Sequence, residues 1–453
     1  GELGRRIELL GDIVDGQVEY APGWPLVADV QGRVHVAGAD TRVEVQRAVS
    51  QQVQIGEAAM VLRDNSAYVE GELRATADAG AALEFVRASP LRENLSFVTP
   101  AWQGSGRLHI QAGLTIPIRT DAAPALAVEL DFDSENVALA MPEYRMVVRQ
   151  LDGSGTFSLP HNLDGEFSAS LFGQPADILA HYNDDWLFFD IDGRATPADV
   201  YRILETDDRV PIEGAFDFDS ILAIAMRGGI TNLFVESDLR GLRIDLPGDF
   251  AKAAEAAEPG DINLQFLADY QSVSWRYRDV RGWLHHGDGI ERGAVGVGIP
   301  PPMTAQTERA IVIAGRMPRV VLSDWVSTDG ESAVALPLDW IIQGLKVDQF
   351  AIDEVNLADV LLTGEQSGDA INFGFEGPTV RGRVALQGTA PVTIALDYLA
   401  LPSTDEVIET HIGAPQPDPI SVAVGRSLPA ARVSIDELKI GTDPFGSWRF
   451  NIE

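Results

Sequence analysis

Residues 126–132 read Leu-Ala-Val-Glu-Leu-Asp-Phe, so that large apolar residues at every second position alternate with small or acidic ones. Successive side chains of a β-strand point to opposite faces, and the stretch therefore predicts a strand with one apolar and one polar face. The same alternation recurs at residues 108–111, 214–219 and 433–436. Asp-Gly pairs typical of turns lie at residues 152–153, 164–165, 192–193, 288–289 and 329–330. The sequence predicts an all-β protein, built as a long antiparallel meander.

A loose repeat accompanies this pattern. A glycine is often followed two positions later by an apolar residue, as in Gly155-Thr156-Phe157 and in residues 165–167. The repeat has no fixed period, which argues against a propeller or a regular β-helix. It is compatible with an open sheet that is extended strand by strand, and equally with the ordinary start of strands in any meander.

Helices are expected to be few and short. Thr196-Pro197-Ala198-Asp199 offers an N-cap, a proline at the first position and a carboxylate at the third, which predicts a helix to about Leu204. The alanine-rich residues 249–257 predict a second helix, and Ser89-Pro90 a third of a single turn. Three prolines within residues 415–419 predict a loop.

The division of the chain follows from these signals. A boundary is expected where the alanine-rich helix ends, which gives a β-groove segment with short helices over residues 1–258. Residues 259–453 would form a continuing β-groove segment, and one continuous domain is the alternative. Because residue 1 is glycine and not a start methionine, we expect the chain to be part of a longer protein.

Composition excludes several classes of function. The chain has 453 residues, no cysteine and a formal net charge of −34. The lack of cysteine excludes disulfides, thiolate metal sites and thiol catalysis. So acidic a chain would be repelled by phosphate backbones, so nucleic acid is not an expected partner. No stretch reaches the 18 or so apolar residues that a membrane-spanning helix needs.

The residues that could carry chemistry do not form a recognisable site. His285 and His286 are the only adjacent histidines, and Asp288 could add a third metal ligand. Neighbours on a strand point to opposite faces, however, so no metal is expected there. Motifs for serine hydrolases, P-loops, zinc proteases and EF-hands are missing. We therefore predict no catalytic residues, no cofactor and no enzyme activity.

Several motifs resemble those of a known family. Residues 237–247 read Ser-Asp-Leu-Arg-Gly-Leu-Arg-Ile-Asp-Leu-Pro and are followed by Lys252. This is similar to a strand motif of the AsmA-like superfamily of bacterial envelope proteins, in its YhdP-type branch, although the match loosens after Pro247. Further points of similarity follow in family order, at residues 23–26, 106–117, 382–384, 396–402, 428–429 and 445–448.

The resemblance implies a Gram-negative protein held in the inner membrane by a segment not included in this chain, with a body that crosses the periplasm. It also implies a long sheet curled into an open groove with an apolar floor, a β-gutter, which conducts phospholipid toward the outer membrane. Acyl chains of phospholipids and the two membranes would then be the partners. The residues expected to line the groove are Leu108, Ile110, Leu126, Val128, Leu130, Phe132, Phe157, Phe167, Phe216, Phe218, Phe234, Leu284, Leu396 and Leu399.

Two other functions stay open at the level of sequence. An extracellular scaffold or adhesin would use the same strands in a β-sandwich whose core is filled by side chains from two sheets. A carbohydrate-active enzyme would need two carboxylates within about 5–10 Å of each other in a tryptophan-lined cleft. The eight tryptophans are spread along the chain, which favours packing roles.

Overall fold

The computed structural model describes residues 8–64, 66–95, 97–117, 127–159, 162–183, 185–203, 211–226, 230–267, 270–287, 289–302, 309–321, 324, 339–352, 355–388, 390–401 and 430–452. The predicted loop at residues 415–419 lies outside them. Within these residues, twenty-five strands are assigned to one large sheet and two to a small one. The contacts separate two compact units, of which unit 1 is residues 1–203 with 215–237, and unit 2 is residues 204–214 with 238–453. The boundary expected at residues 258 and 259 stays a prediction, because a group of contacts is not a test of independent folding.

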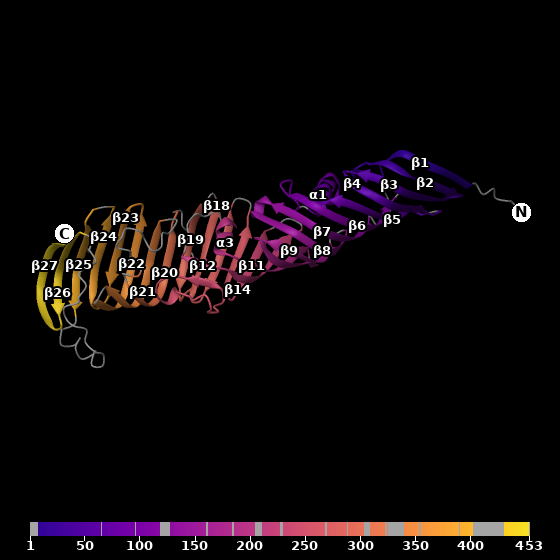
Figure 1. Ribbon diagram of the computed structural model, residues 1–453. Coiled ribbons are helices and arrows are strands. Elements are labelled where there is room, and N and C mark those ends of the chain that lie inside the picture. The colour runs from indigo at the N-terminus through magenta and orange to yellow at the C-terminus, as the bar shows by residue number, and fades with distance from the viewer. Residues whose placement is uncertain are drawn as a thin grey trace. The chain divides into compact units, whose positions relative to one another are not determined.

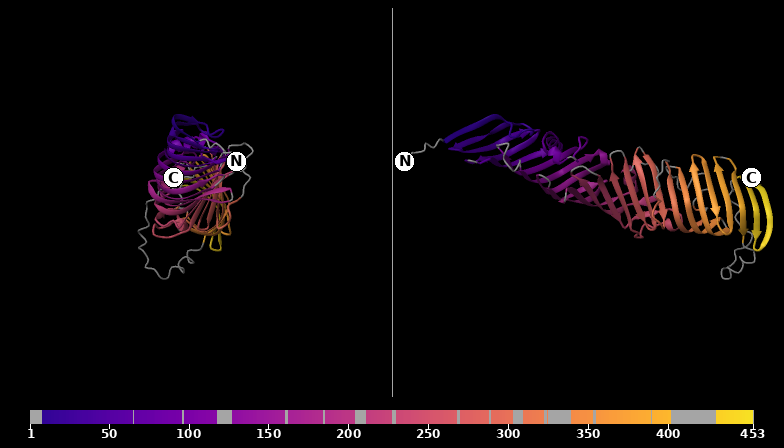
Figure 2. Two further views of the ribbon diagram at one scale, coloured as in Figure 1. Left: turned by 90° about the vertical axis from the view of Figure 1, so that its right-hand side faces the viewer. Right: turned by 180° about the vertical axis from the view of Figure 1, so that it is seen from behind.

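Unit 1 is a run of antiparallel strands that pair in chain order (Figures 1 and 2). The strands are β1 (Glu8–Val18), β2 (Val27–Ala37), β3 (Asp40–Ser50), β4 (Val53–Leu62), β5 (Tyr68–Asp78), β6 (Gln103–Pro117), β7 (Ala127–Met141), β8 (Met146–Ser158), β9 (Asn162–Leu171), β10 (Gln174–Asn183), β11 (Trp186–Ala195), β13 (Phe216–Ala225) and β14 (Thr231–Ser237). Among the described strands β1 pairs only with β2, so this run does not close on itself.

Unit 2 continues in the same style, again with each strand beside its neighbour in the chain (Figure 1). Its strands are β16 (Gly260–Phe266), β17 (Gln271–Tyr277), β18 (Val280–Gly287), β19 (Gly289–Val297), β20 (Ile311–Val321), β21 (Trp340–Ile352), β22 (Val355–Ser367), β23 (Ala370–Glu376), β24 (Val380–Gln387), β25 (Val392–Leu401), β26 (Ala431–Ile440) and β27 (Asp443–Ile452). The small sheet pairs β12 (Ile212–Gly214) with β15 (Leu242–Ile244).

Three pairs in unit 2 depart from the predicted meander. The pairs β19–β20, β20–β21 and β25–β26 are parallel, whereas every other described pair is antiparallel. Two parallel neighbours start at the same end of the sheet, so the connection must return the chain along the length of a strand. These three links are therefore longer than a hairpin turn. The prediction of an all-β protein with few short helices is confirmed.

Irregularities aligned on neighbouring strands bend the sheet of unit 1. Gly106, Asn136 and Gln150 have positive φ values of 101°, 49° and 49°, and each lies at an interruption of the pairing register, in β6, β7 and β8. The backbone N–H of Asn136 donates to Oδ1 of Asp152 at 2.6 Å, which satisfies a group that the interrupted ladder leaves unpaired. Such bulges bend and twist the strands that carry them, and three side by side curve the sheet locally.

The helices are short. They are α1 (Ala79–Ala88), α2 (Leu91–Asn94), α3 (Pro197–Ile203) and the 3₁₀ turns η1 (Pro142–Tyr144) and η2 (Gly248–Phe250). The helix expected after Thr196 is confirmed as α3, where Oδ2 of Asp199 accepts from the backbone N–H and the hydroxyl of Thr196. The turn expected after Ser89-Pro90 is confirmed as α2.

The predicted alanine-rich helix is wrong. Only η2 forms, and Lys252 then pairs with Ile244 in an antiparallel bridge. The backbone oxygen of Ala254 accepts from the N–H of Gly241, and the N–H of Glu258 donates to Asp238. Backbone hydrogen bonds to a neighbouring segment therefore override the helix propensity of the alanines.

Candidate functional site

Apolar residues of neighbouring strands lie directly opposite one another in unit 1. One row runs Ala112, Leu130, Phe157 and Leu163 across β6, β7, β8 and β9. Paired residues share a face of the sheet, so these side chains lie together. The adjacent row on the other face runs Gln111, Asp131, Thr156 and Asp164. One face is therefore apolar and the other polar across these four strands.

The apolar face continues across the rest of unit 1. Phe167 of β9 pairs with Ile178 of β10, which pairs with Ile191 of β11. Phe218 of β13 pairs with Gly193, and Phe216 with Ala195. We call this surface, from β2 to β13, the apolar face of unit 1.

Unit 2 has an apolar face of its own. One row of paired residues runs Leu264, Val273, Leu284, Gly293 and Ile311, from β16 to β20. A second row on the same face runs Leu345, Leu362, Phe375, Gly382, Leu396 and Ile435, from β21 to β26. Leu399 lies on the same face, because a register shift pairs it with Val380, and it packs with Leu438.

The predicted lining residues fall into three groups. Unit 1 brings nine of them onto its apolar face, and these are Leu108, Ile110, Val128, Leu130, Phe132, Phe157, Phe167, Phe216 and Phe218. Unit 2 brings Leu284, Leu396 and Leu399 onto its own apolar face. Phe234 pairs with the exposed Ile221 and so lies on the opposite face of β13 and β14, while Leu126 is outside the described residues. That these residues line a lipid path stays a prediction.

Other residues of these faces were missed at the level of sequence. Ile178 and Leu179 are adjacent, but Ile178 lies on the apolar face and Leu179 on the other, where its side chain is 44% exposed. Where adjacent residues of a strand are both apolar, the sequence does not show which of them lies on the apolar face. Phe350 was missed for the same reason, since Phe350 and Ala351 are both buried.

The apolar face of unit 1 is only partly shielded. Leu108, Ile110, Leu130, Phe132 and Phe167 are half-buried, whereas acidic and polar side chains on the other face are exposed. In the part of the chain that the structure describes, the only sheet apart from the large one is β12–β15, and it belongs to unit 2. The described residues of unit 1 therefore supply no second sheet to pack on this face, as a β-sandwich would require.

A helix covers one region of this face. Ala82 and Phe85 of α1 pack against Val53, Ala75 and Ala77, which belong to β4 and β5 (Figure 1). The cap residue Asp78 ends β5 and accepts from the backbone N–H of Gly80, so the chain turns directly from strand into helix. The helix is thus seated where the strand that precedes it ends.

In unit 2 an irregular segment takes a similar position. Phe250, at the end of η2, packs against the buried cluster that includes Met317 and Val347 of the apolar face. The hydroxyl of Tyr277 donates to the backbone oxygen of Phe250 at 3.4 Å. Arg278 donates to the backbone oxygens of Asp249 and Ala251 and to Glu258. The segment is therefore tied to the rim of unit 2 by the turn between β17 and β18.

A buried lysine holds this segment together. The Nζ atom of Lys252 donates to the backbone oxygens of Leu242 at 2.8 Å and Ala253 at 3.1 Å. Burial is the main cause that lowers the pKa of this amine below its usual value. Two carbonyl acceptors account for the buried side chain, which gives Lys252 a structural role in the motif that resembles the AsmA-like strand.

A scan against protein families matches residues 2–453, nearly the whole chain, to the family described as "YhdP protein". The chain belongs to the YhdP family. The resemblance predicted from the motifs is therefore confirmed. At the level of the family this supports an envelope protein of the lipid-transport type, and the YhdP family is not a known enzyme family. A search of curated proteins found no match.

Two absences in the described part of this YhdP-family chain bear on the site. No described helix combines the length and apolar character needed to cross a membrane. No three His, Asp or Glu side chains among the described residues are grouped so that they could hold a metal ion. His285 and His286 lie on opposite faces of β18, where His285 accepts from Nε of Arg292 at 3.1 Å.

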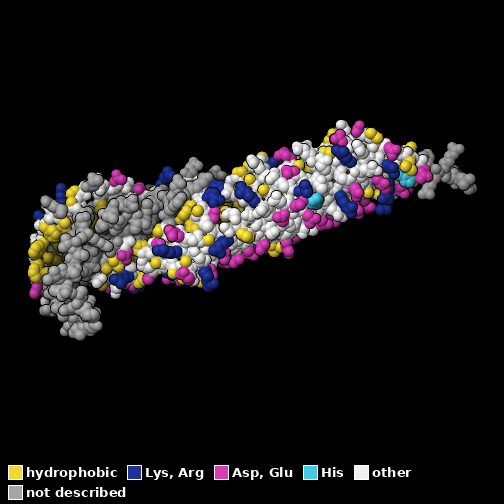
Figure 3. Space-filling model, in the orientation of Figure 1, with side chains coloured by type: hydrophobic (Ala, Val, Ile, Leu, Met, Phe, Trp, Pro, Cys, Tyr) yellow, Lys and Arg dark blue, Asp and Glu magenta, His cyan; other side chains and the backbone are white. Residues whose placement is uncertain are grey.

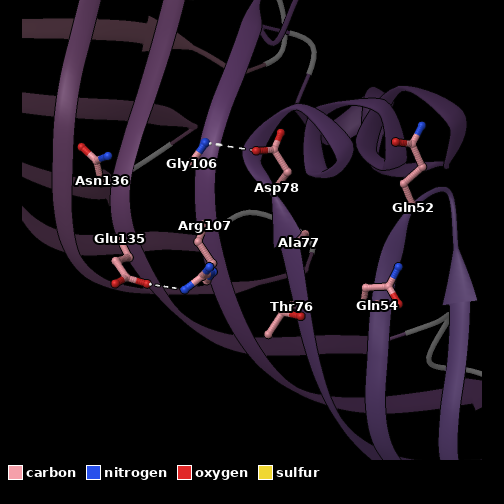
Figure 4. Close-up of a pocket in the computed structure, with 9 residues that line it drawn as sticks. All are labelled: Gln52, Gln54, Thr76, Ala77, Asp78, Gly106, Arg107, Glu135 and Asn136. Carbon is pink, nitrogen blue, oxygen red and sulfur yellow. Dashed lines mark hydrogen bonds and ion pairs between the residues drawn. The ribbon is translucent and has the colours of Figure 1, made fainter.

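A polar cavity of about 510 Å³ lies on the polar face of unit 1 (Figure 4). It is lined by the turn between β3 and β4 and by residues of β4, β5, β6 and β7. Arg107 forms an ion pair with Glu135 at 3.2 Å, and Oδ2 of Asp78 accepts from the backbone N–H of Gly106. The lining residues include no tryptophan. This cavity does not match the tryptophan-lined cleft that a carbohydrate-active enzyme would need.

The polar face of unit 1 carries a ladder of like charges. Asp177, Asp192, Asp219 and Glu236 lie directly opposite one another on β10, β11, β13 and β14, and acidic side chains are spread over the visible surface of this unit in Figure 3. Partial desolvation, followed by a hydrogen bond and the charges of Asp219 and Asp177, raises the pKa of Asp192 above its ordinary value. Like charges directly opposite on a sheet are destabilising.

Replacing Asp192 with asparagine is expected to raise the midpoint of thermal unfolding by about 1–3 °C at about pH 7. A carboxyl whose pKa is raised by folding favours the folded state when protonated, so wild-type stability falls as the pH rises through that pKa. The gain should therefore shrink as the pH is lowered and the wild-type carboxyl becomes protonated. Thermal unfolding of both chains, measured from about pH 7 down to acidic pH, checks this difference in midpoint.

Asp131→Asn is the matched control, because Asp131 lies on the same face opposite the neutral Gln111 and Thr156. Equal shifts in the two variants would show that the ladder is not the cause.

Proposed function

We propose that this chain conducts phospholipid through the periplasm between the inner and outer membranes, with the acyl chains lying on the apolar faces of its two units. The observation that carries the proposal is the apolar face of unit 1, which runs from strand to strand and receives no second sheet from the described residues of that unit. The protein acts as a surface for transfer, and no residue is assigned a catalytic role.

The energy of lipid transfer explains why such a face is useful. Two acyl chains hold roughly 30 CH₂ groups, and exposing them to water costs on the order of 20–25 kcal/mol at about 0.8 kcal/mol each. Lipid therefore crosses an aqueous space rapidly only if apolar surface accompanies it. With strands about 4.8 Å apart, the series from β2 to β13 in unit 1 offers a path of roughly 50 Å.

The polar face supports the same function. Acidic residues cover the side opposite the apolar face. Water therefore solvates the acidic side, and the apolar side is available to acyl chains. A net charge of −34 also keeps such a surface from adsorbing to anionic headgroups. Contact with lipid is therefore favoured on the apolar face alone.

A scaffold or adhesin with a filled core is the alternative. It would bury its apolar residues under a second sheet, and the half-buried Leu130 and Phe132 do not favour that arrangement.

The test is native mass spectrometry with lipid extraction on the chain purified without detergent from bacterial cells. The expected result is phospholipid that co-purifies with the folded chain and is recovered from it by extraction with organic solvent. A folded, lipid-free protein that also takes up no phospholipid from vesicles would overturn the proposal and favour the scaffold.

A further inference from the structure

Several aromatic rings of the apolar faces lie over a glycine on the neighbouring strand. Phe218 of β13 pairs with Gly193 of β11, and a Cβ atom added to Gly193 would lie 2.9 Å from Cζ and 3.2 Å from Cε1 of that ring. The other near atom is Cβ of Ala176, at 3.6 Å. The ring thus occupies the space in which any other residue would place its side chain.

The same arrangement occurs in unit 2. Trp275 of β17 pairs with Gly282 of β18, and a Cβ atom on Gly282 would lie 2.5 Å from Cε2 and from Cη2 of the indole. A third instance is Phe132 of β7, whose Cζ would lie 2.7 Å from a Cβ on its partner Gly155. The device is therefore shared by strands far apart in the chain.

The backbone does not require glycine at Gly193 or Gly282. Neither residue has the positive φ that side chains avoid, and the three atoms nearest to each added Cβ belong to side chains. At Gly155, in contrast, a Cβ would also meet the backbone oxygen of Asp164 at 2.9 Å. At each of these two positions, the aromatic ring on the neighbouring strand is what favours glycine.

We propose that Gly193 and Gly282 are positioning residues that set the depth of the apolar groove, because each lets a large ring lie against the sheet and leaves the space above it for acyl chains. This inference rests on the proposed lipid transport. With a larger residue beneath it, the ring would have to turn away from the sheet and project into that space. In this position Phe218 is buried and Trp275 is half-buried, so both rings pack apolar area against the sheet instead of projecting from it.

The test compares Gly193→Ala and Gly282→Ala with Gly113→Ala. A Cβ on Gly113 would meet only the backbone oxygen of Glu129, at 3.9 Å, so this control changes a strand glycine without moving a ring. Phospholipid per chain is measured by native mass spectrometry, and folding by thermal unfolding. We expect each of the two variants to bind lipid about tenfold more weakly, the effect of losing contact with roughly two CH₂ groups. The control should match the wild type.

A second substitution restores the space. Combining Gly193→Ala with Phe218→Leu replaces the ring by a smaller side chain, and lipid binding is expected to recover. If the alanine variants stay folded and bind lipid like the wild type, the inference is overturned. It is also overturned if their binding falls only with their stability and the double variant does not recover. A wild-type chain that binds no lipid would overturn the proposed function itself, which separates that failure from this one.

Discussion

Replacing Ile178 with asparagine is expected to weaken phospholipid binding about tenfold or more, since an amide on the apolar floor costs on the order of 1–3 kcal/mol when acyl chains cover it. Ile178 is half-buried and lies between Phe167 and Ile191, near the middle of the apolar face of unit 1. Binding is measured by titration with a fluorescent phospholipid and by the lipid that co-purifies.

The next residue provides a matched control. Leu179 belongs to the same strand but lies on the polar face, opposite Glu166 and Asp190. Leu179→Asn should leave lipid binding unchanged, because its side chain is already 44% exposed to water. Similar losses in the two variants would place the lipid elsewhere than on the apolar face.

Replacing Phe350 with alanine is expected to destabilise unit 2 by about 3–5 kcal/mol. Its side chain is 2% exposed and its ring packs edge-on against Phe375, with 5.6 Å between ring centroids. Each strand of such a sheet contacts mainly its neighbours, so the loss should spread over a few strands only. Hydrogen exchange should therefore accelerate in β20–β23 and stay unchanged in β5–β9.

Phe450→Ala tests whether any lost phenyl ring has this effect. Phe450 is 46% exposed on β27, and its removal should change the free energy of unfolding by less than about 1 kcal/mol. If Phe350→Ala accelerated exchange equally in the strands of unit 1, the sheet would unfold as a single cooperative unit, contrary to the expectation.

The alternation of apolar and polar residues was sufficient to predict a β-rich fold, because many strands keep one phase over most of their length. It placed twelve of the fourteen expected lining residues on the apolar faces. Phe234 was misplaced because Leu233, Phe234 and Val235 are all apolar, and only the pairing of Leu233 with Leu222 selects the face. Pairing is a property of two strands, and one strand alone does not contain it.

Helices were harder to predict than strands. The helix α1 starts where β5 ends, and its Asp78 cap was not recognised within the strand pattern. The alanine-rich segment showed the opposite error, since the buried Lys252 and its backbone acceptors hold that segment extended. Long-range contacts decided both cases, and propensity does not report them.

One glycine of the Gly-x-apolar repeat, Gly165, lies against the ring that follows it. A Cβ on Gly165 would lie 2.7 Å from the ring of Phe167, two positions later on the same strand. The glycine thus leaves room for the ring within β9. The sequence contained this pattern, but not the orientation of the ring.

Strand-by-strand pairing in chain order has a consequence for how proteins of this kind change length. A hairpin inserted between two strands adds two alternations of direction and leaves every other strand with its former neighbours on at least one side, so both faces keep their character. Each inserted hairpin would lengthen the sheet by roughly 10 Å. A single added strand would end at the opposite end of the sheet from the next strand's start. A long return connection would then be needed, as at the parallel pair β25–β26. The distance that such a sheet spans is therefore a quantity that evolution can adjust in small steps, independently of the chemistry of its surface.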